Sequence, residues 1–284
     1  MKKIETLGDW LLNAQSQLNG IKEIDTPALE AQVLAAFCLE QTRTWVLTHH
    51  DFVLSPSLLS FLGISLQKRL QLIPLPYIIG KWEFYNLEFL ISPQVLIPRP
   101  ETELLVGEAL NWLSTHPKRC ELLEIGTGSG CISVSLAVHL PNLKITATDV
   151  SAGALSVATR NSQKHNVAHQ INFIRNNLAD SIQYQFDIIC ANLPYIPSNK
   201  LAELSVSQSE PLLALDGGPD GLDLIRTLLK DCHRLIKPRA LILLEIEAGQ
   251  GHSAFQLAQQ IFPAAKVRIL PDYAGRPRLL FIES

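Results

Sequence analysis

Residues 121–139 read ELLEIGTGSGCISVSLAVH, a run in which three kinds of local structure follow one another. The letters ELLEI at 121–125 are typical of a short buried strand, and the residues after Gly130 fit a helix. Glycines at 126, 128 and 130 separate the two segments, and glycine lets the backbone turn sharply and approach a ligand closely. A strand, a glycine loop and a helix in this order predict the first unit of an α/β sheet that binds a nucleotide.

A carboxylate follows at the end of the next predicted strand, where KITATD finishes with Asp149. Placed there, it can accept hydrogen bonds from both ribose hydroxyls of an adenosine. The fingerprint GxGxxG would indicate NAD, but the third glycine here, Gly130, comes one residue early. The spacing therefore favours S-adenosylmethionine. A nicotinamide oxidoreductase is the weaker reading, and a plain glycine turn beside a surface Asp is the structural alternative.

Short apolar segments alternate with amphipathic ones from Pro100 onward, which predicts a parallel-rich, doubly wound sheet. No helix fits between the last two segments, so PDYAGRPR predicts an antiparallel C-terminal hairpin. The fold class expected is α/β, with a Rossmann-like sheet of seven strands. These strands are predicted at 121–125, 144–148, 171–174, 186–190, 240–246, 266–270 and 279–283.

The N-terminal part has a helical pattern, with apolar residues recurring at steps of three and four. Thr26-Pro27 and Ser55-Pro56 are typical helix starts, because Pro is favoured at the first helical position. Alternation around Tyr85-Asn86 predicts a β-hairpin. The predicted organisation is an all-α domain at 1–75, a β-hairpin linker at 76–95 and the α/β domain at 96–284.

The amino-acid composition limits the classes of protein to which this chain can belong. Of 284 residues, 47% are hydrophobic and 18% charged, with a net charge of −3, so the chain is expected to be globular and lacks the basic excess typical of nucleic-acid binding. Five scattered cysteines and eight histidines show no spacing typical of a disulfide framework or a metal site. No secretory or membrane segment is evident, which predicts a cytoplasmic protein with free thiols.

A second polar motif ends another buried strand, where FDIICA at 186–191 runs into Asn192-Leu-Pro-Tyr195. In an open α/β sheet the carboxyl ends of the strands meet at the edge where ligands bind. The Asn192 side chain and the next backbone carbonyl offer two acceptors for both hydrogens of a planar NH₂ group. The Tyr195 ring could pack against the amide or base that carries that nitrogen. A simple strand-ending turn is the alternative interpretation.

The motifs together resemble the peptide chain release factor N5-glutamine methyltransferase family over nearly the whole chain. Glycine loops and Asn-x-Pro-Tyr occur in many methyltransferases, and two longer segments are the specific ones. The segments that carry the resemblance are FYNLEF at 84–89, VLIPRPETE at 95–103, EIGTGSG at 124–130, NLPY at 192–195, EPLLALDGGPDGLD at 210–223 and DYAGRPR at 272–278.

By position, the resemblance implies a set of site residues. The cofactor residues are Gly126, Thr127, Gly128, Ser129, Gly130, Asp149, Asn177 and Asn192, and the residues that grip the substrate glutamine are Asn192, Leu193, Pro194 and Tyr195. Two positions depart from the family, which usually has Pro at 193 and commonly an aromatic residue at 177. Pro100 also reads as an ordinary helix start, and a role for Arg99 stays open.

The sequence thus predicts an S-adenosylmethionine-dependent methyltransferase domain at 96–284, and the resemblance implies that the methyl group goes to a glutamine side-chain amide. The resemblance implies that this glutamine lies in the Gly-Gly-Gln motif of class-1 release factors, with no metal and no membrane partner. An N6-adenine methyltransferase acting on DNA or rRNA is the alternative, since Asn-Leu-Pro-Tyr is similar to the rRNA adenine dimethylases. The neutral-to-acidic balance makes direct nucleic-acid binding the weaker expectation. A noncatalytic adaptor is a third reading.

Overall fold

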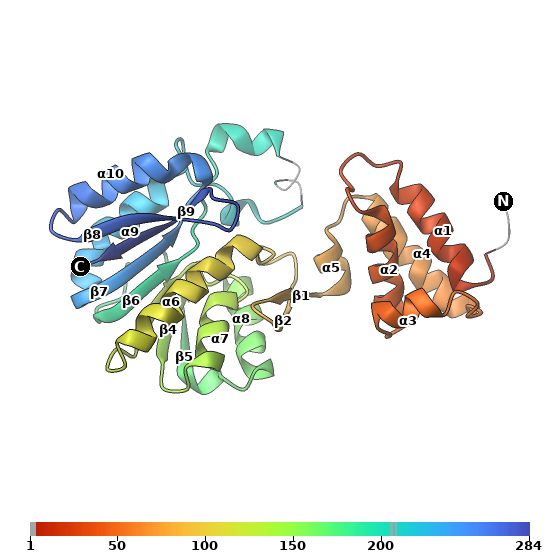
Figure 1. Ribbon diagram of the computed structural model, residues 1–284, viewed down its shortest axis with the longest axis horizontal. Helices are drawn as coiled ribbons and strands as arrows, with labels where there is room; N and C mark the ends of the chain where they lie inside the picture. The colour runs from red at the N-terminus through yellow and green to blue at the C-terminus, as the bar shows by residue number, and fades with distance from the viewer. Residues whose placement is uncertain (1–3, 205–206, 208) are drawn as a thin grey trace. The chain divides into compact units, whose positions relative to one another are not determined.

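The computed structural model describes residues 4–204, 207 and 209–284, and the chain divides after Gly80 into two compact units. Residues 1–80 form a helical unit and residues 81–284 form an α/β unit (Figure 1). Each unit has its own hydrophobic core. The two are described separately below.

Two helices of the helical unit, α2 and α4, start where the sequence predicts them. Pro27 and Pro56 occupy first-turn positions, and the Ser55 hydroxyl accepts a hydrogen bond from the backbone N–H of Leu58. A partly buried ion pair joins Arg69 to Glu30 at 2.5 Å. The described helices are α1 Leu7–Leu18, α2 Pro27–Cys38, α3 Arg43–Thr48, α4 Pro56–Leu70 and α5 Leu75–Ile79.

The α/β unit opens with the predicted hairpin, β1 Lys81–Phe84 and β2 Leu87–Leu90. Tyr85 and Asn86 have φ values of 50° and 58°, as a two-residue turn with both central residues in the left-handed region requires. The strand alternation in the sequence and the turn at these two residues are therefore confirmed.

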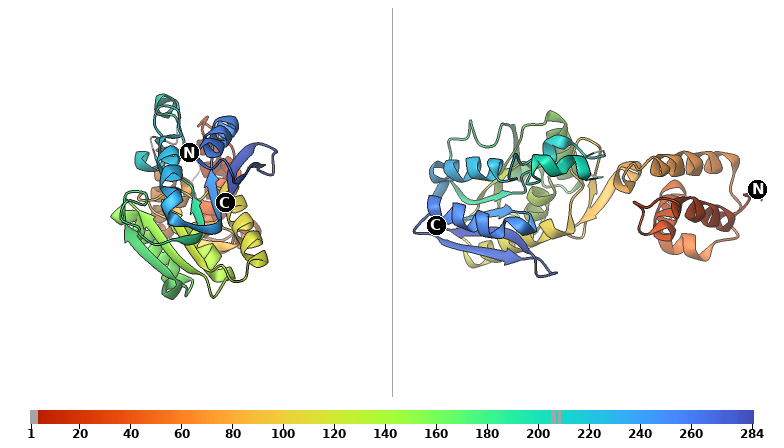
Figure 2. Two further views of the ribbon diagram at one scale, coloured as in Figure 1. Left: turned by 90° about the vertical axis from the view of Figure 1, so that its left-hand side faces the viewer. Right: turned by 90° about the horizontal axis from the view of Figure 1, so that it is seen from above.

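Seven strands form one sheet within the described part of this unit (Figures 1 and 2). Their order is β5-β4-β3-β6-β7-β9-β8, parallel except for β9, which pairs antiparallel with both β7 and β8. The predicted α/β class, strand positions and antiparallel hairpin are confirmed. Bounds are β3 Glu121–Ile125, β4 Lys144–Asp149, β5 Ile171–Arg175, β6 Phe186–Ala191, β7 Ile236–Glu245, β8 Lys266–Pro271 and β9 Pro277–Glu283.

The chain order reverses between β3 and β6, which are neighbours in the sheet although β4 and β5 lie between them in sequence. Such a reversal opens a crevice at the carboxyl ends of the two strands, where α/β folds bind ligands. α9 and α10 share one apolar cluster with side chains of β6 and β7, including Ile189 and Ile242. The long helices are α6 Glu103–Thr115, α7 Cys131–His139, α8 Ala152–Lys164, α9 Asp223–Leu235 and α10 Gly251–Ile261.

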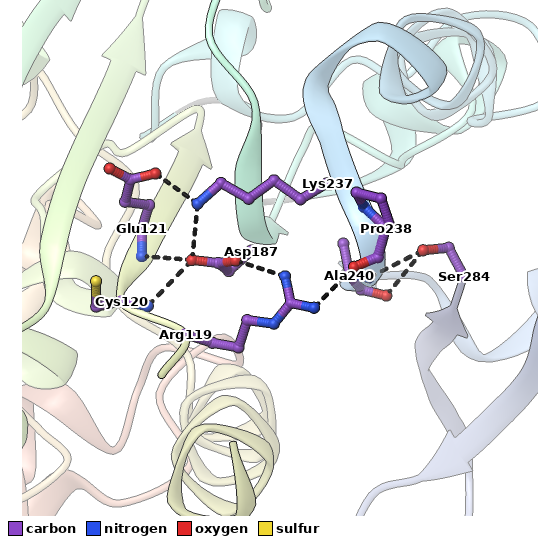
Figure 3. A network of polar contacts seen from close by, with 8 residues as sticks. All are labelled: Arg119, Cys120, Glu121, Asp187, Lys237, Pro238, Ala240 and Ser284. Atoms are coloured by element: carbon purple, nitrogen blue, oxygen red, sulfur yellow. Dashed lines mark hydrogen bonds and ion pairs between the residues drawn. The ribbon is translucent and has the colours of Figure 1, made fainter. Parts of the chain in front are cut away.

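The amino edge of the sheet is held by a polar cluster around Asp187, at the start of β6 (Figure 3). Its carboxylate accepts hydrogen bonds from Arg119 at 2.8 Å, from Lys237 at 3.1 Å and from the backbone N–H groups of Cys120 and Glu121, each at 3.1 Å. Burial raises the pKa of Asp187, but these donors outweigh burial and leave the pKa below its ordinary value. The cluster thus ties β6 to β3 and β7 at the edge opposite the predicted site.

Among the described residues, no helix combines the length and the apolar character that crossing a membrane requires.

Candidate active site

Four residues, one at the end of each of four neighbouring strands, lie side by side at the carboxyl edge because the strands are in register. Ile125 pairs with Thr148 on one side and Ala191 on the other, and Ala191 pairs with Leu244. The next residue of each strand is therefore a neighbour of the others. In sheet order these residues are Asp149, Gly126, Asn192 and Glu245.

A cavity opens at this edge, with an empty volume of about 1130 Å³ including its mouth. Its lining brings together nearly all the predicted site residues, and adds the segment before α6 and the loop after β6. Gly130 and Tyr195 are the two predicted residues absent from the lining. The predicted residues that do line it are Gly126, Thr127, Gly128, Ser129, Asp149, Asn177, Asn192, Leu193 and Pro194.

The three glycines of the loop all have positive φ values but serve different purposes. A Cβ at Gly126 would lie 3.2 Å from the Leu193 side chain, so this glycine lets the two site segments approach each other. A Cβ at Gly128 would meet no atom within 4 Å, which leaves open space beside the cavity. At Gly130 a Cβ would lie 3.0 Å from Ala158, so this glycine serves the packing of α7 against α8.

Glu124 is a buried carboxylate beneath the loop. Its Oε2 accepts hydrogen bonds from the hydroxyl of Thr127 at 2.7 Å and from the hydroxyl and backbone N–H of Ser133, but Oε1 has no partner among the described residues. Burial raises its pKa to about 7. Since Glu124 lines the cavity, the free oxygen can accept a hydrogen bond from a cationic amino group such as that of S-adenosylmethionine.

Asp149 receives two backbone hydrogen bonds, from Gly128 and Ser151, each at 2.9 Å. One bond goes to each carboxylate oxygen, so each keeps a lone pair for a ribose hydroxyl. Burial raises the pKa of Asp149 above its ordinary value. Asn177 is exposed and donates to Asp180 at 3.1 Å. An Asn side chain has no aromatic ring on which adenine could stack. The donor and acceptor set fits S-adenosylmethionine.

Two buried side chains, those of Thr102 and Glu245, hold the Asn192–Tyr195 segment by hydrogen bonds. The Asn192 amide nitrogen donates to the Thr102 hydroxyl at 3.0 Å, and the Tyr195 hydroxyl donates to Glu245 at 3.3 Å. Leu193 is buried, and its side chain belongs to the apolar cluster that α9 and α10 share with β6 and β7. The sequence suggested only a backbone role at 193, and the structure adds this packing role.

The loop EPLLALDGGPDGLD, at 210–223, packs against the same segment. A Cβ at Gly217 would lie 2.7 Å from the Pro194 carbonyl oxygen, and one at Gly221 would lie 2.1 Å from the Tyr195 carbonyl oxygen. That Tyr195 oxygen accepts a hydrogen bond from Gln250 at 2.9 Å. The glycines therefore let the loop support the Asn192–Tyr195 backbone at a distance that no side chain would permit.

Arg99 pairs with Glu210, at 2.5 Å, and Glu210 also accepts from the backbone N–H of Ile97 at 3.0 Å. This buried carboxylate ties the IPRP segment to the loop after β6, and Arg99 also lines the cavity. Pro100 begins a short 3-10 helix, Pro100–Thr102, that leads into α6.

Sequence reasoning missed Thr102 and Glu245 as site residues. A signal for Glu245 was present, because ALILLEI places a carboxylate at the end of an otherwise apolar strand. Thr102 gave no such signal within PRPETE. Among the described residues, no group of three or more His, Cys, Asp or Glu side chains could hold a metal ion.

Comparisons with known proteins agree with this geometry. The family described as PrmC N-terminal domain matches residues 9–80, and Methyltransferase small domain matches residues 102–217. A release factor glutamine methyltransferase of Moorella thermoacetica is 39% identical over 90% of this chain and 90% of its own length. Another, of Koribacter versatilis, is 35% identical over 93% of this chain and 95% of its own.

Solved structures show the fold at low sequence identity. The hMettl16 catalytic domain in complex with MAT2A 3′UTR hairpin 6 gives a TM-score of 0.54 at 16% identity, covering 77% of this chain and 81% of that one. A methyltransferase from Pyrococcus furiosus gives 0.51 at 17% identity, covering 70% and 89%. These structural similarities support the fold, and the sequence relatives identify the family. The chain belongs to the release factor glutamine methyltransferase family.

Proposed function

We propose that this protein transfers a methyl group from S-adenosylmethionine to the side-chain amide nitrogen of a release factor glutamine, giving N5-methylglutamine. The observation that carries the proposal is the position of Asn192, directly after a central strand and beside Gly126 of the cofactor loop. The sequence relatives of the same length, which are named for this reaction, support it. We take the glutamine to be that of the Gly-Gly-Gln motif of class-1 release factors.

Three groups would hold the cofactor. Glu124 would accept from its amino group, the backbone around Gly128 would lie against its methionine part, and Asp149 would accept from its ribose hydroxyls. When bound, S-adenosylmethionine would supply a sulfonium methyl: the bond from sulfur to the methyl carbon breaks as the carbon–nitrogen bond forms, S-adenosylhomocysteine is the leaving group, and the nitrogen loses one of its two protons to solvent water.

The chain's own contribution is to hold the glutamine amide in place. Asn192 Oδ1 and the backbone carbonyl of Leu193 accept from the two amide hydrogens and fix the plane of the NH₂ group. Because the lone pair of a planar amide nitrogen is delocalised, alignment of this nitrogen with the methyl carbon matters more than the presence of a strong general base. Holding the reacting atoms in a near-attack arrangement lowers the activation barrier by roughly several kcal/mol. The adenine-methylating alternative is not favoured by the relatives' names.

The direct test is mass spectrometry of a purified release factor incubated with the enzyme and S-adenosylmethionine. We expect a mass gain of one methyl group on the glutamine of the Gly-Gly-Gln motif. A substrate in which this glutamine is replaced by Ala is the control and should gain nothing. An unmodified glutamine after incubation with cofactor-binding enzyme would overturn the proposal.

Asp149→Ala is expected to weaken S-adenosylmethionine binding by about 1–3 kcal/mol, because the ribose hydroxyls lose their acceptors in a partly buried site. Calorimetric titration of the enzyme alone measures this change, and a cooperative thermal transition shows that the variant folds. An affinity equal to that of wild type would refute the ribose assignment.

Leu193→Pro is expected to keep kcat on the release factor within about fivefold, because Pro retains the carbonyl and the family resemblance implies Pro at this position. Proline fixes φ near −65° and removes a backbone N–H, and both should be tolerated. Leu193→Ala is the comparison. It removes a buried side chain beside Gly126, so it should lower the free energy of unfolding by about 2–5 kcal/mol. A Pro variant that binds cofactor but has lost turnover would contradict the carbonyl role.

A further inference from the structure

A buried chain of hydrogen bonds runs from the cavity to the end of β7. Asn192 donates to Thr102 at 3.0 Å, Thr102 donates to Glu245 Oε2 at 2.7 Å, and Tyr195 donates to Glu245 Oε1 at 3.3 Å. The Thr102 and Glu245 side chains belong to residues 2% and 1% exposed. Groups so far from water hold their hydrogen-bond pattern, since a lost bond leaves a buried polar atom unpaired.

The single proton of the Thr102 hydroxyl fixes the direction of this chain. When Glu245 is ionised it can only accept, so the Thr102 proton points to Glu245 and the Thr102 lone pairs accept from Asn192. Only the nitrogen of the Asn192 amide can donate. Its nitrogen is therefore turned toward Thr102, and Oδ1 is the end left for an incoming N–H.

We propose that Glu245, acting through Thr102, is a positioning residue that keeps the Asn192 amide oxygen directed at the substrate NH₂ group. The inference rests on the proposed function, since it concerns how Asn192 reads the glutamine amide. It gives a purpose to the buried carboxylate of β7 and to the Thr of the PRPETE segment. Neither residue lies next to the substrate-gripping motif in sequence.

The direction of the chain depends on the ionisation of Glu245. Burial raises its pKa to about 7, while hydrogen bonds from Thr102 and Tyr195 and the charge of Arg278 oppose that rise and Glu101 adds to it. Cys131 also lies within electrostatic range. A protonated Glu245 can donate a hydrogen bond to the Thr102 hydroxyl. The Thr102 hydroxyl can then donate to Asn192, whose amide rotates so that its oxygen accepts. Turnover should therefore fall as the pH drops below about 7.

Thr102→Val is the decisive variant, because Val matches the shape of Thr without the hydroxyl. We expect kcat to fall by about tenfold to 100-fold with S-adenosylmethionine affinity within about threefold of wild type. Thr102→Ser restores the hydroxyl and should recover most of the lost turnover. Glu245→Gln can still accept from Thr102 and donate to Tyr195, so it should keep measurable turnover and show a weaker loss of kcat at low pH than wild type.

A double-mutant cycle separates positioning from simple support of the fold. Once Asn192 is Ala, Thr102→Val has no amide left to orient and should lower kcat by less than about twofold more. Equal losses in both backgrounds would overturn the inference, as would wild-type turnover in folded Thr102→Val. Because wild-type methylation is measured in the same assay, a failure of the proposed function itself would appear separately, as an unmodified glutamine with every enzyme.

Discussion

Asn192→Ala is expected to lower kcat on the release factor by about 100-fold or more, while S-adenosylmethionine affinity stays within about tenfold of wild type. The reason is that Asn192 supplies an acceptor that aligns the amide nitrogen with the methyl carbon, and misaligned reactants lose much of the advantage of being bound together. Single-turnover kinetics on the release factor, with cofactor affinity from calorimetry, measure the two quantities separately.

The comparison of these two losses decides the role of Asn192. A turnover loss much larger than the affinity loss means that the residue acts on the substrate. Equal losses would show that Asn192 serves mainly the cofactor, and the amide-holding geometry would then be wrong. Asp149→Ala provides the opposite pattern for reference, since its expected effect is on cofactor binding.

Removal of residues 1–80 is expected to lower kcat/KM on the whole release factor by about 100-fold while the α/β unit still binds S-adenosylmethionine. The helical unit has its own core, and we propose that it docks the release factor away from the glutamine. A single glutamine side chain offers too little surface to select one protein substrate. Contacts remote from the reacting atoms can supply that selection.

A short peptide that carries the Gly-Gly-Gln motif is the matched control for this experiment. The peptide cannot reach a remote docking surface, so its kcat/KM should be about equal for the full chain and for residues 81–284. Loss of activity on both substrates would point to misfolding, which the cofactor titration would reveal. Full kcat/KM on the whole release factor with the shortened chain would refute the docking role.

Local patterns were sufficient for much of the fold. Alternation of apolar strands with amphipathic helices predicted the strands of the sheet, and Pro27 and Pro56 marked helix starts. The two motifs at the ends of β3 and β6 were predictable because parallel strands present their carboxyl ends at one edge. Asp149 could be added from its place at the end of the neighbouring strand.

Partnerships between distant segments were not predictable from one sequence. Thr102 and Glu245 are 143 positions apart, and no local periodicity connects a Thr in a helix start with a Glu in a strand. The sequence assigned no role to the glycines at 217 and 221, and only the structure shows that each lies against the carbonyl of a site residue. Gly130, which the resemblance implies as a cofactor residue, lies outside the cavity lining and close to Ala158, and nothing in the sequence indicated this packing.

Strand β6 carries the Asp187 charge cluster near one end and leads directly into Asn192 at the other. The two residues are five positions apart, roughly 16 Å along an extended strand. Everything between them is buried and paired on both sides, so the strand is a rigid spacer. Substitutions in the Asp187 cluster and at Asn192 should therefore have nearly additive effects on stability, because sites more than about 10 Å apart that share no partner rarely couple.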